Sequence, residues 1–289
     1  SDGKTTTTTL ISELLKAEGK TVYLGGNIGK ALLPQIERIR EEDVAVVELS
    51  SFQLISMRRS PDVAVVTNVA PNHLDVHKDM QEYIDAKKNL IVHQNAFSRT
   101  VLNADNDITH DMGRLVRGAL NWFSRKITPQ NGAFLGEDGS VNLVRNGKVT
   151  RIMHKDQIRL PGIHNVENYL AAISATAGAV SIQTIIKVAE SFGGVEHRIE
   201  FVRMLDGVKY YNDSIATSPT RTIAGLNSFQ QKLIVLAGGY DKKIPFEPLA
   251  PVLIERAKVL ILMGVTALKI KAAVTGCEGY DPNVLEIIE

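Results

Sequence analysis

The first residues of the chain have the types and order of a phosphate-binding loop. The segment from Ser1 to Thr6 matches the second half of the pattern G-x-x-x-x-G-K-[ST], and a helix-forming stretch follows directly. In such loops, backbone N–H groups and the helix N-terminus hold an anionic phosphate. The lysine reaches the β- and γ-phosphates, and the first hydroxyl after it binds magnesium. Gly3, Lys4 and Thr5 are therefore predicted to bind a nucleoside triphosphate and its metal.

Two further candidate metal ligands lie at or just after the ends of predicted strands. Glu48 ends an aliphatic strand, where a magnesium-binding carboxylate is expected beside a phosphate loop. The alternative for Glu48 is an exposed carboxylate at a strand end. His73 lies in a polar loop after the next strand and could be a ligand, although most loop histidines are simply solvated. Asp75 could orient His73 or cap the next helix.

Lysine and asparagine side chains on two predicted helices leave their roles open. Nothing in the residue pattern separates Lys87 from Lys88, so the pattern predicts that both face solvent. Asn165 and Asn168 lie three residues apart at a helix start and would share one face. Their carboxamides could read a purine edge through paired hydrogen bonds, or they could act as helix N-caps.

The second half of the chain carries charged residues beside predicted strands. Arg198 could neutralise phosphate charge, and Asp213 at a strand end could accept a hydrogen bond from a ribose hydroxyl. The alternative for each is an ordinary surface ion. The loop over 238–243 either offers lysine ammonium groups to an anionic substrate or is a plain turn.

Short apolar runs alternate with helical patterns over most of the chain. The runs 44–49 and 63–67 are typical of a parallel sheet covered on both faces, and a helix is expected over 80–93. Turn signals at 137–140 and 145–148 predict hairpins at a sheet edge. The predicted fold class is α/β: a P-loop domain with a mostly parallel sheet over 1–194, and an incomplete Rossmann-like domain over 195–289 without an obvious final element.

Composition excludes several classes of protein. The 289 residues favour two domains, and 44% hydrophobic with 22% charged residues is ordinary for a globular protein. A net charge of +1, without a basic arm or an acidic tail, argues against nucleic acid or a membrane surface as partner. Cys277, the single cysteine, excludes an internal disulfide and suits the cytoplasm. Because the chain begins inside the loop motif, we expect it to be a fragment of a larger protein.

Taken together, these segments resemble the Mur ligases. G-K-T-T is followed by G-G-N-I-G at 25–29, E-L-S-S-F-Q at 48–53 and N-x-x-x-x-H-L-D at 68–75. The segments L-P-G-x-H-N-x-x-N, H-R-x-E and N-D-S continue the resemblance over nearly the entire chain. Within the family, G-G-N-I-G paired with E-L-S-S-F-Q favours the member that adds D-glutamate.

The resemblance implies a three-domain protein, of which this chain would hold the central ATPase domain and most of the C-terminal domain. The reaction would use ATP to convert the carboxylate of UDP-N-acetylmuramoyl-L-alanine into an acyl phosphate, which the amine of D-glutamate then attacks. ATP and two Mg²⁺ ions would be the cofactors. The resemblance implies a cytoplasmic monomer that makes peptidoglycan precursors, and the fragment alone is expected to be inactive.

The family's functional residues carry over by motif. Lys4, His73 and Lys87 would be catalytic, and Lys87 would be a lysine carbamylated by carbon dioxide, which replaces the solvent-facing prediction. The implied metal ligands are Thr5, Glu48, His73 and Lys87. The implied ATP contacts are Gly3, Lys4, Thr5, Thr6, Asn165, Asn168, Arg198 and Asp213, and the implied substrate contacts are Asn27, Thr217 and Lys242.

One position departs from the family pattern. Ile215 stands where many relatives carry lysine, at a position that the resemblance implies would contact D-glutamate. Two alternatives therefore stay open. One is another Mur or folylpolyglutamate-type ligase that adds a different amino acid, and the other is a nucleotide-binding module without catalysis.

Overall fold

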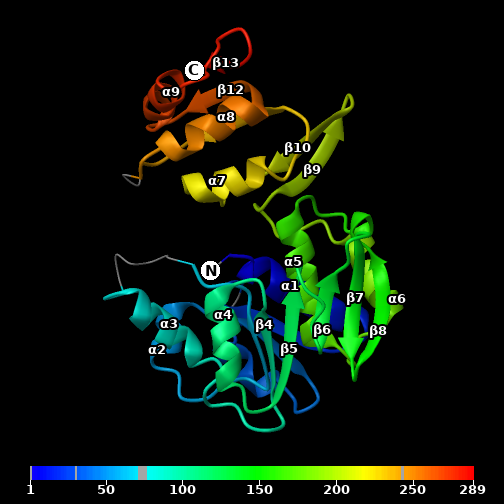
Figure 1. Ribbon diagram of the computed structural model, residues 1–289. Helices are drawn as coiled ribbons and strands as arrows, with labels where there is room; N and C mark the ends of the chain where they lie inside the picture. Colours follow the sequence, from blue (N-terminus) through cyan, green and yellow to red (C-terminus); the bar gives the residue numbers. More distant parts are fainter. Residues whose placement is uncertain (1, 30, 71–76, 242–243) are drawn as a thin grey trace. The chain divides into compact units, whose positions relative to one another are not determined.

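The computed structural model describes residues 2–29, 31–70, 77–241 and 244–289, which form two compact units over 1–192 and 193–289 (Figure 1). Each unit has hydrophobic clusters of its own. His73, Asp75 and Lys242 lie outside the described residues. No helix in the described ranges combines the length and apolarity needed to cross a bilayer.

A six-stranded sheet forms most of the first unit, in the order β3-β4-β5-β6-β7-β8. Neighbouring strands are parallel from β3 to β6 and antiparallel from β6 to β8, so the expected hairpins close one edge. A separate parallel pair joins β1 to β2. The fold is thus mixed α/β with a mostly parallel sheet. The strands are β1 (Val22–Gly26), β2 (Val44–Glu48), β3 (Val63–Val66), β4 (Arg99–Asn103), β5 (Ala119–Ser124), β6 (Gly132–Leu135), β7 (Ser140–Arg145) and β8 (Lys148–His154).

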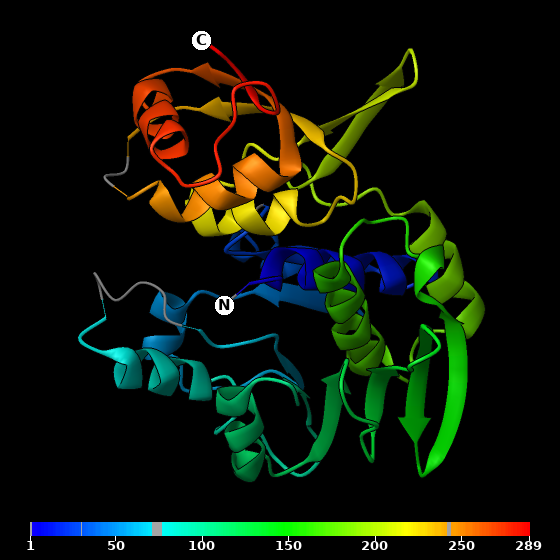
Figure 2. The ribbon, with the colours of Figure 1, turned by 45° about the horizontal axis from the view of Figure 1, so that its top comes forward.

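Helices cover both faces of this sheet, because successive strand residues point to opposite sides. Val101 on β4 packs in the cluster that contains α1 and α5, whereas its neighbour Leu102 packs with residues of α3 and α4. In both views α1 and α5 lie side by side (Figure 1, Figure 2). The helical segments are α1 (Lys4–Ala17), η1 (Leu33–Arg38), α2 (Ser51–Ile55), α3 (Met80–Lys88), α4 (Asp107–Met112), η2 (Gly113–Leu115), η3 (Lys155–Gln157), α5 (Ile163–Thr176) and α6 (Ile182–Ser191).

The helix expected over 80–93 is shorter than predicted. It begins where the Asp79 side chain accepts a hydrogen bond from the Glu82 N–H, and it ends at Lys88. Residues 89–93 form turns, and the Gln94 side chain that follows them donates to the backbone carbonyls of Pro61 and Arg99. Tertiary hydrogen bonds therefore end a helix that the local pattern would continue.

The second unit contains an antiparallel pair, β9-β10, and a parallel three-stranded sheet in the order β11-β12-β13. The expectation of no final element was wrong, because β13 pairs with β12. A three-residue strand is too short to show an alternating pattern. The elements are β9 (Glu200–Leu205), β10 (Val208–Asn212), α7 (Pro219–Leu226), β11 (Leu233–Gly238), η4 (Glu247–Leu249), α8 (Ala250–Arg256), β12 (Ala257–Met263), α9 (Ala267–Thr275) and β13 (Glu286–Ile288).

Candidate nucleotide and metal site

The predicted phosphate loop leads directly into α1. Gly3 precedes the helix with a φ of 76°, a left-handed conformation that glycine adopts without strain. The loop is held at the carboxyl end of β3, because the Thr67 hydroxyl donates to the Asp2 carbonyl at 2.8 Å and the Asp2 N–H donates to the Asn68 side chain at 2.8 Å. The N-terminus of α1 therefore lies at the carboxyl ends of the parallel strands, where open α/β folds bind ligands.

Glu48 receives hydrogen bonds from two other predicted site residues. Thr5 Oγ1 donates to Glu48 Oε2 at 2.7 Å, and Asn27 Nδ2 donates to Glu48 Oε1 at 3.1 Å. Gly26 lies opposite Glu48 in the β1–β2 pair, and a Cβ at Gly26 would lie 2.2 Å from the Glu48 carbonyl oxygen. The lack of a side chain at Gly26 therefore lets the two strands approach each other at Glu48. Glu48 is 4% exposed, so the alternative of an exposed strand-end carboxylate was wrong.

A carboxylate and a hydroxyl side by side are a suitable start for a magnesium site. Mg²⁺ binds oxygen ligands and is usually held by one or two carboxylates together with substrate phosphates. Glu48 and Thr5 supply such oxygens at the start of a helix that is predicted to hold phosphate. The residues present therefore fit the ion that the sequence predicted.

Lys87 is buried, unlike its neighbour on α3. Lys87 is 5% exposed and its Nζ lies 4.7 Å from the centre of the Tyr83 ring, whereas Lys88 is partly exposed and bonds to Asp85 at 2.8 Å. Burial, with a smaller effect from the charge of Lys4, lowers the pKa of Lys87 to about 8. Lys4 and Lys87 both line a cavity of about 40 Å³. The solvent-facing prediction from the residue pattern was therefore wrong for Lys87.

A buried histidine that the sequence analysis did not identify joins α2 to α3. His77 is 3% exposed, its Nε2 lies 2.9 Å from Ser51 Oγ, and its Nδ1 lies 3.4 Å from Glu82 Oε2. Its ring stacks on Phe52 and meets the edge of Tyr83, the ring over which Lys87 lies. No local pattern marks His77, because its contacts come from residues on two helices.

Asn165 and Asn168 tie α5 to the phosphate loop. Both are buried inside the helix, whose N-cap is Gly162, so the N-capping alternative was wrong. Asn168 Nδ2 donates to Asn165 Oδ1 at 3.1 Å, and the Thr7 hydroxyl donates to Asn168 Oδ1 at 3.2 Å. A Cβ at Gly3 would lie 2.3 Å from Asn168 Oδ1. The contact of these carboxamides with adenine stays a prediction.

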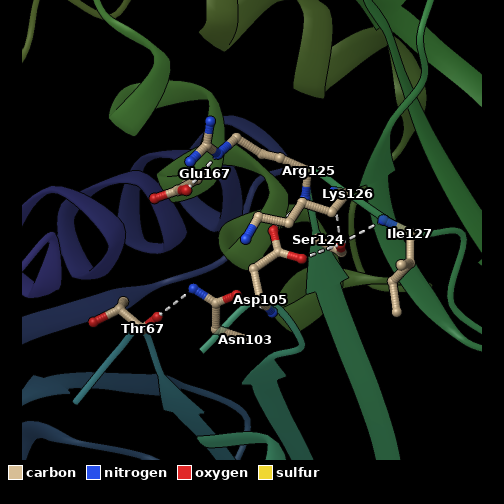
Figure 3. A network of polar contacts seen from close by, with 8 residues as sticks. All are labelled: Thr67, Asn103, Asp105, Ser124, Arg125, Lys126, Ile127 and Glu167. Atoms are coloured by element: carbon tan, nitrogen blue, oxygen red, sulfur yellow. Dashed lines mark hydrogen bonds and ion pairs between the residues drawn. The ribbon is translucent and has the colours of Figure 1, made fainter. Parts of the chain in front are cut away.

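A polar network joins the carboxyl ends of the next strands to α5 (Figure 3). Asp105 accepts hydrogen bonds from Ser124 Oγ at 2.5 Å and from the Arg125 N–H at 2.7 Å. Arg125 in turn donates through Nε to Glu167 at 2.5 Å, beside Asn168 on α5. These residues were not predicted from the sequence, although polar residues directly after apolar strands were a usable signal.

Arg198 and Asp213, two predicted residues of the second unit, lie at a strained backbone segment. Arg198 stands between His197 and Ile199, whose φ angles are 66° and 44°. Positive φ is costly for a β-branched residue, and such strain concentrates at functional sites. Asp213 accepts a hydrogen bond from the Ile199 N–H at 3.1 Å, and burial raises the pKa of its carboxyl. Thr217 is exposed, and its N–H donates to the Ile215 carbonyl at 2.8 Å.

Comparison with known proteins identifies relatives along both units. Residues 1–176 match the Mur ligase middle domain. Two proteins named UDP-N-acetylmuramoylalanine--D-glutamate ligase, from Acetivibrio thermocellus and Clostridium acetobutylicum, are 57% and 54% identical over 94% of this chain. The chain spans 58% of the length of these relatives.

Solved structures share the fold at low sequence identity. A UDP-N-acetylmuramoyl-L-alanyl-D-glutamate--2,6-diaminopimelate ligase is 21% identical with a TM-score of 0.69. A pseudomurein peptide ligase type C from Methanothermus fervidus is 18% identical with a TM-score of 0.66. Both matches cover 100% of this chain and 66% of the solved chain, so they show the fold across both units.

Proposed function

Since the chain belongs to the Mur ligase family, we propose that the whole protein uses ATP to join D-glutamate to UDP-N-acetylmuramoyl-L-alanine. The names of the relatives that are more than 50% identical support this choice of substrates. In the structure, the contact of Thr5 with Glu48 at the N-terminus of α1 is the observation that carries the proposal. It joins a phosphate loop to a buried carboxylate of the kind that metal-dependent phosphoryl transfer requires.

The proposed reaction has two steps. A carboxylate oxygen of the muramoyl substrate attacks the γ-phosphorus of ATP, and ADP leaves. The amine of D-glutamate then attacks the acyl carbon, inorganic phosphate leaves, and the amine nitrogen loses a proton. Lys4 and the first N–H groups of α1 would hold the β- and γ-phosphates and stabilise the charge that develops on the transferred group.

Glu48 and Thr5 would hold magnesium, with His73 and a carbamate on Lys87 as further proposed ligands. The bound ion would neutralise phosphate charge. Asn27 keeps the Glu48 carboxylate in place through its 3.1 Å hydrogen bond, and it is also proposed to contact the muramoyl substrate.

The state of Lys87 suits carbamylation. The neutral amine attacks carbon dioxide and loses one proton, so the reaction needs an unprotonated lysine. Because burial and the charge of Lys4 lower the pKa of Lys87 to about 8, much of this amine is neutral in mildly alkaline buffer. The negative carbamate would then offset the charge of Lys4.

The remaining residues are proposed to bind the two small substrates. Asn165, Asn168, Arg198 and Asp213 would contact the adenine, phosphate and ribose of ATP. Thr217 and Lys242 would contact D-glutamate. We propose that the whole protein is a monomer in the cytoplasm, where it makes a peptidoglycan precursor.

Amino-acid-dependent phosphate release tests the proposed substrates. The full-length protein is mixed with ATP, Mg²⁺ and UDP-N-acetylmuramoyl-L-alanine, and then with D-glutamate, 2,6-diaminopimelate or L-lysine in separate reactions. We expect phosphate release with D-glutamate only. Release with another amino acid alone would instead support the rival ligase, and no release with any would support a module without catalysis.

A pair of neighbouring lysines tests the carbamate. Lys87→Ala should abolish ligase activity, because the proposed ligand to magnesium is lost. Lys88→Ala removes a partly exposed ion pair on the same helix and should leave activity nearly unchanged. Short carboxylic acids should partly restore the Lys87→Ala variant, and bicarbonate should not. Full activity in Lys87→Ala would refute the carbamate role while leaving the proposed substrates intact.

A further inference from the structure

A second cavity lies where β4 and β5 begin, at the end of the strands opposite the candidate site. Its volume is about 230 Å³. No acidic residue is among the described residues that line it. The lining groups with the most to offer a ligand are Arg99, Asn121, Asn131, Arg145 and Asn146. Two guanidinium groups and three carboxamides provide many hydrogen-bond donors and two positive charges.

Arg99 is held in this cavity by the end of α5. Its Nη1 donates to the carbonyl oxygens of Ala175 and Ala177, both at 3.0 Å. These bonds to the described residues use one nitrogen of the guanidinium, and Nε and Nη2 remain as donors. The side chain is therefore fixed in position while most of its donors remain available to a ligand.

Arg145 reaches the same turn from the β7–β8 hairpin. A Cβ built on Gly178 would lie 2.6 Å from Arg145 Nη1 and 3.1 Å from its Cζ, so the guanidinium packs against the glycine backbone. Gly178 follows Ala177, whose carbonyl binds Arg99. The two arginines thus converge on one turn from separate elements.

The converging charges are only partly balanced. Burial lowers the pKa of Arg99, and the charge of Arg145 lowers it further. The C-terminus of α5 provides roughly half a negative charge, which is less than the two positive charges beside it. An anion in the cavity would compensate the excess and would bond to both guanidinium groups.

We propose that this cavity binds a small phosphate-class dianion, either inorganic phosphate or a phosphate monoester. Arginine recognises such oxygens through paired N–H donors, and the asparagine carboxamides can supply further hydrogen bonds. The present contacts of Asn121 with Ser174 and of Asn131 with Asn146 are both 3.3 Å, long enough to give way to a ligand. The proposal does not depend on the ligase activity, because the site lies at the other end of the strands.

Titration with two phosphate compounds tests the cavity. The full-length protein carries Lys4→Ala, which weakens phosphate binding at α1, and it is titrated at constant ionic strength with inorganic phosphate or glycerol 3-phosphate. We expect calorimetry to show saturable binding of either compound. Tighter binding of one of the two identifies the source of the phosphate group.

Matched arginine variants locate the binding. Arg145→Gln in the same background should weaken it at least tenfold, since a charge-assisted pair is lost. Arg151→Gln removes an exposed arginine on β8 and should leave the affinity unchanged. Thermal unfolding should agree with calorimetry. Phosphate should raise the Tm of the Lys4→Ala protein and should not raise the Tm of the Lys4→Ala, Arg145→Gln double variant. Equal affinity in the Arg145→Gln and Arg151→Gln proteins, or no saturable binding, would overturn the proposal.

Discussion

At the residue scale, the ionisation of Lys87 is the clearest consequence of the tertiary structure. The side chain is almost fully buried, and the charge of Lys4 acts on it in addition. Its pKa falls from 10.5 to about 8, so the unfolded chain holds this proton more tightly than the folded chain does. Folding is therefore penalised while the lysine is charged.

This penalty predicts a pH-dependent difference between variants. Below about pH 8 the penalty is fully present, and it disappears as the pH rises toward 10.5. Lys87→Met should therefore be more stable than the parent at pH 7, and the difference should shrink by roughly 2 to 3 kcal/mol on going to pH 10, since one pKa unit corresponds to ~1.36 kcal/mol. Urea unfolding in buffer free of carbon dioxide measures it. Lys88→Met is the control, and the same pH dependence in that variant would show that the burial of Lys87 is not the cause.

At the element scale, helices are joined through buried polar side chains. Asn168 connects α5 to α1 through Thr7, and His77 connects α2 to α3 through Ser51. Leaving a buried polar group without its partner lowers the free energy of unfolding by more than the hydrogen bond itself contributes to it. These contacts should therefore couple the stability of the helices that carry the candidate site.

The α1–α5 contact predicts a coupling between two substitutions. Asn168→Ala should destabilise the protein by about 2 kcal/mol, because it leaves the buried Thr7 hydroxyl without its acceptor. In the double variant with Thr7→Val, the loss should be clearly smaller than the sum of the two single losses. Denaturant unfolding of all four proteins gives the coupling. Thr9→Val, whose hydroxyl bonds within α1, should be additive with Asn168→Ala, and an additive Thr7→Val would contradict the contact.

The α2–α3 contact predicts a second loss of stability. His77→Ala should cost about 3 kcal/mol, since it removes a buried ring and the partner of Ser51. His93→Ala, at an exposed position just beyond α3, should change stability by less than about 0.5 kcal/mol. Thermal unfolding compares the two variants, and equal effects would rule out the packing role of His77.

At the scale of the whole molecule, the two units have separate hydrophobic clusters. Leu170 on α5 and Leu260 on β12 are both 0% exposed, each within the cluster of its own unit. Local stability follows the cooperative unit in which a side chain is packed. A cavity in one unit should therefore weaken that unit first.

Hydrogen exchange can resolve this difference. Leu260→Ala should lower protection of amides within 193–289 by about 3 kcal/mol and should affect residues 1–192 much less. Leu170→Ala should produce the reverse pattern. Mass spectrometry of peptides from both units provides the readout, and equal loss of protection everywhere in both variants would show a single cooperative unit.

Much of the fold could be predicted from the sequence because its signals are local. The aliphatic runs of β2 and β3, the turn signals of the β6–β8 hairpins and the phosphate loop at α1 all depend on neighbouring residues. Glu48 and Thr5 could be named as candidate metal ligands for the same reason, and folding brings their side chains together. Elements that depend on distant partners were missed or misjudged, namely the short strand β13 and the end of α3 at Lys88.

The sequence alone thus determined the fold class, the phosphate loop and the family, since ordered motifs along the chain carry them. Only the tertiary structure distinguished Lys87 from Lys88, placed Asn168 over Gly3, and brought Arg99 and Arg145 to one turn. Burial and electrostatic coupling are sums over neighbours that lie far apart in the chain. A residue pattern reports the type of a side chain, whereas its ionisation and its partners are decided by what folding packs around it.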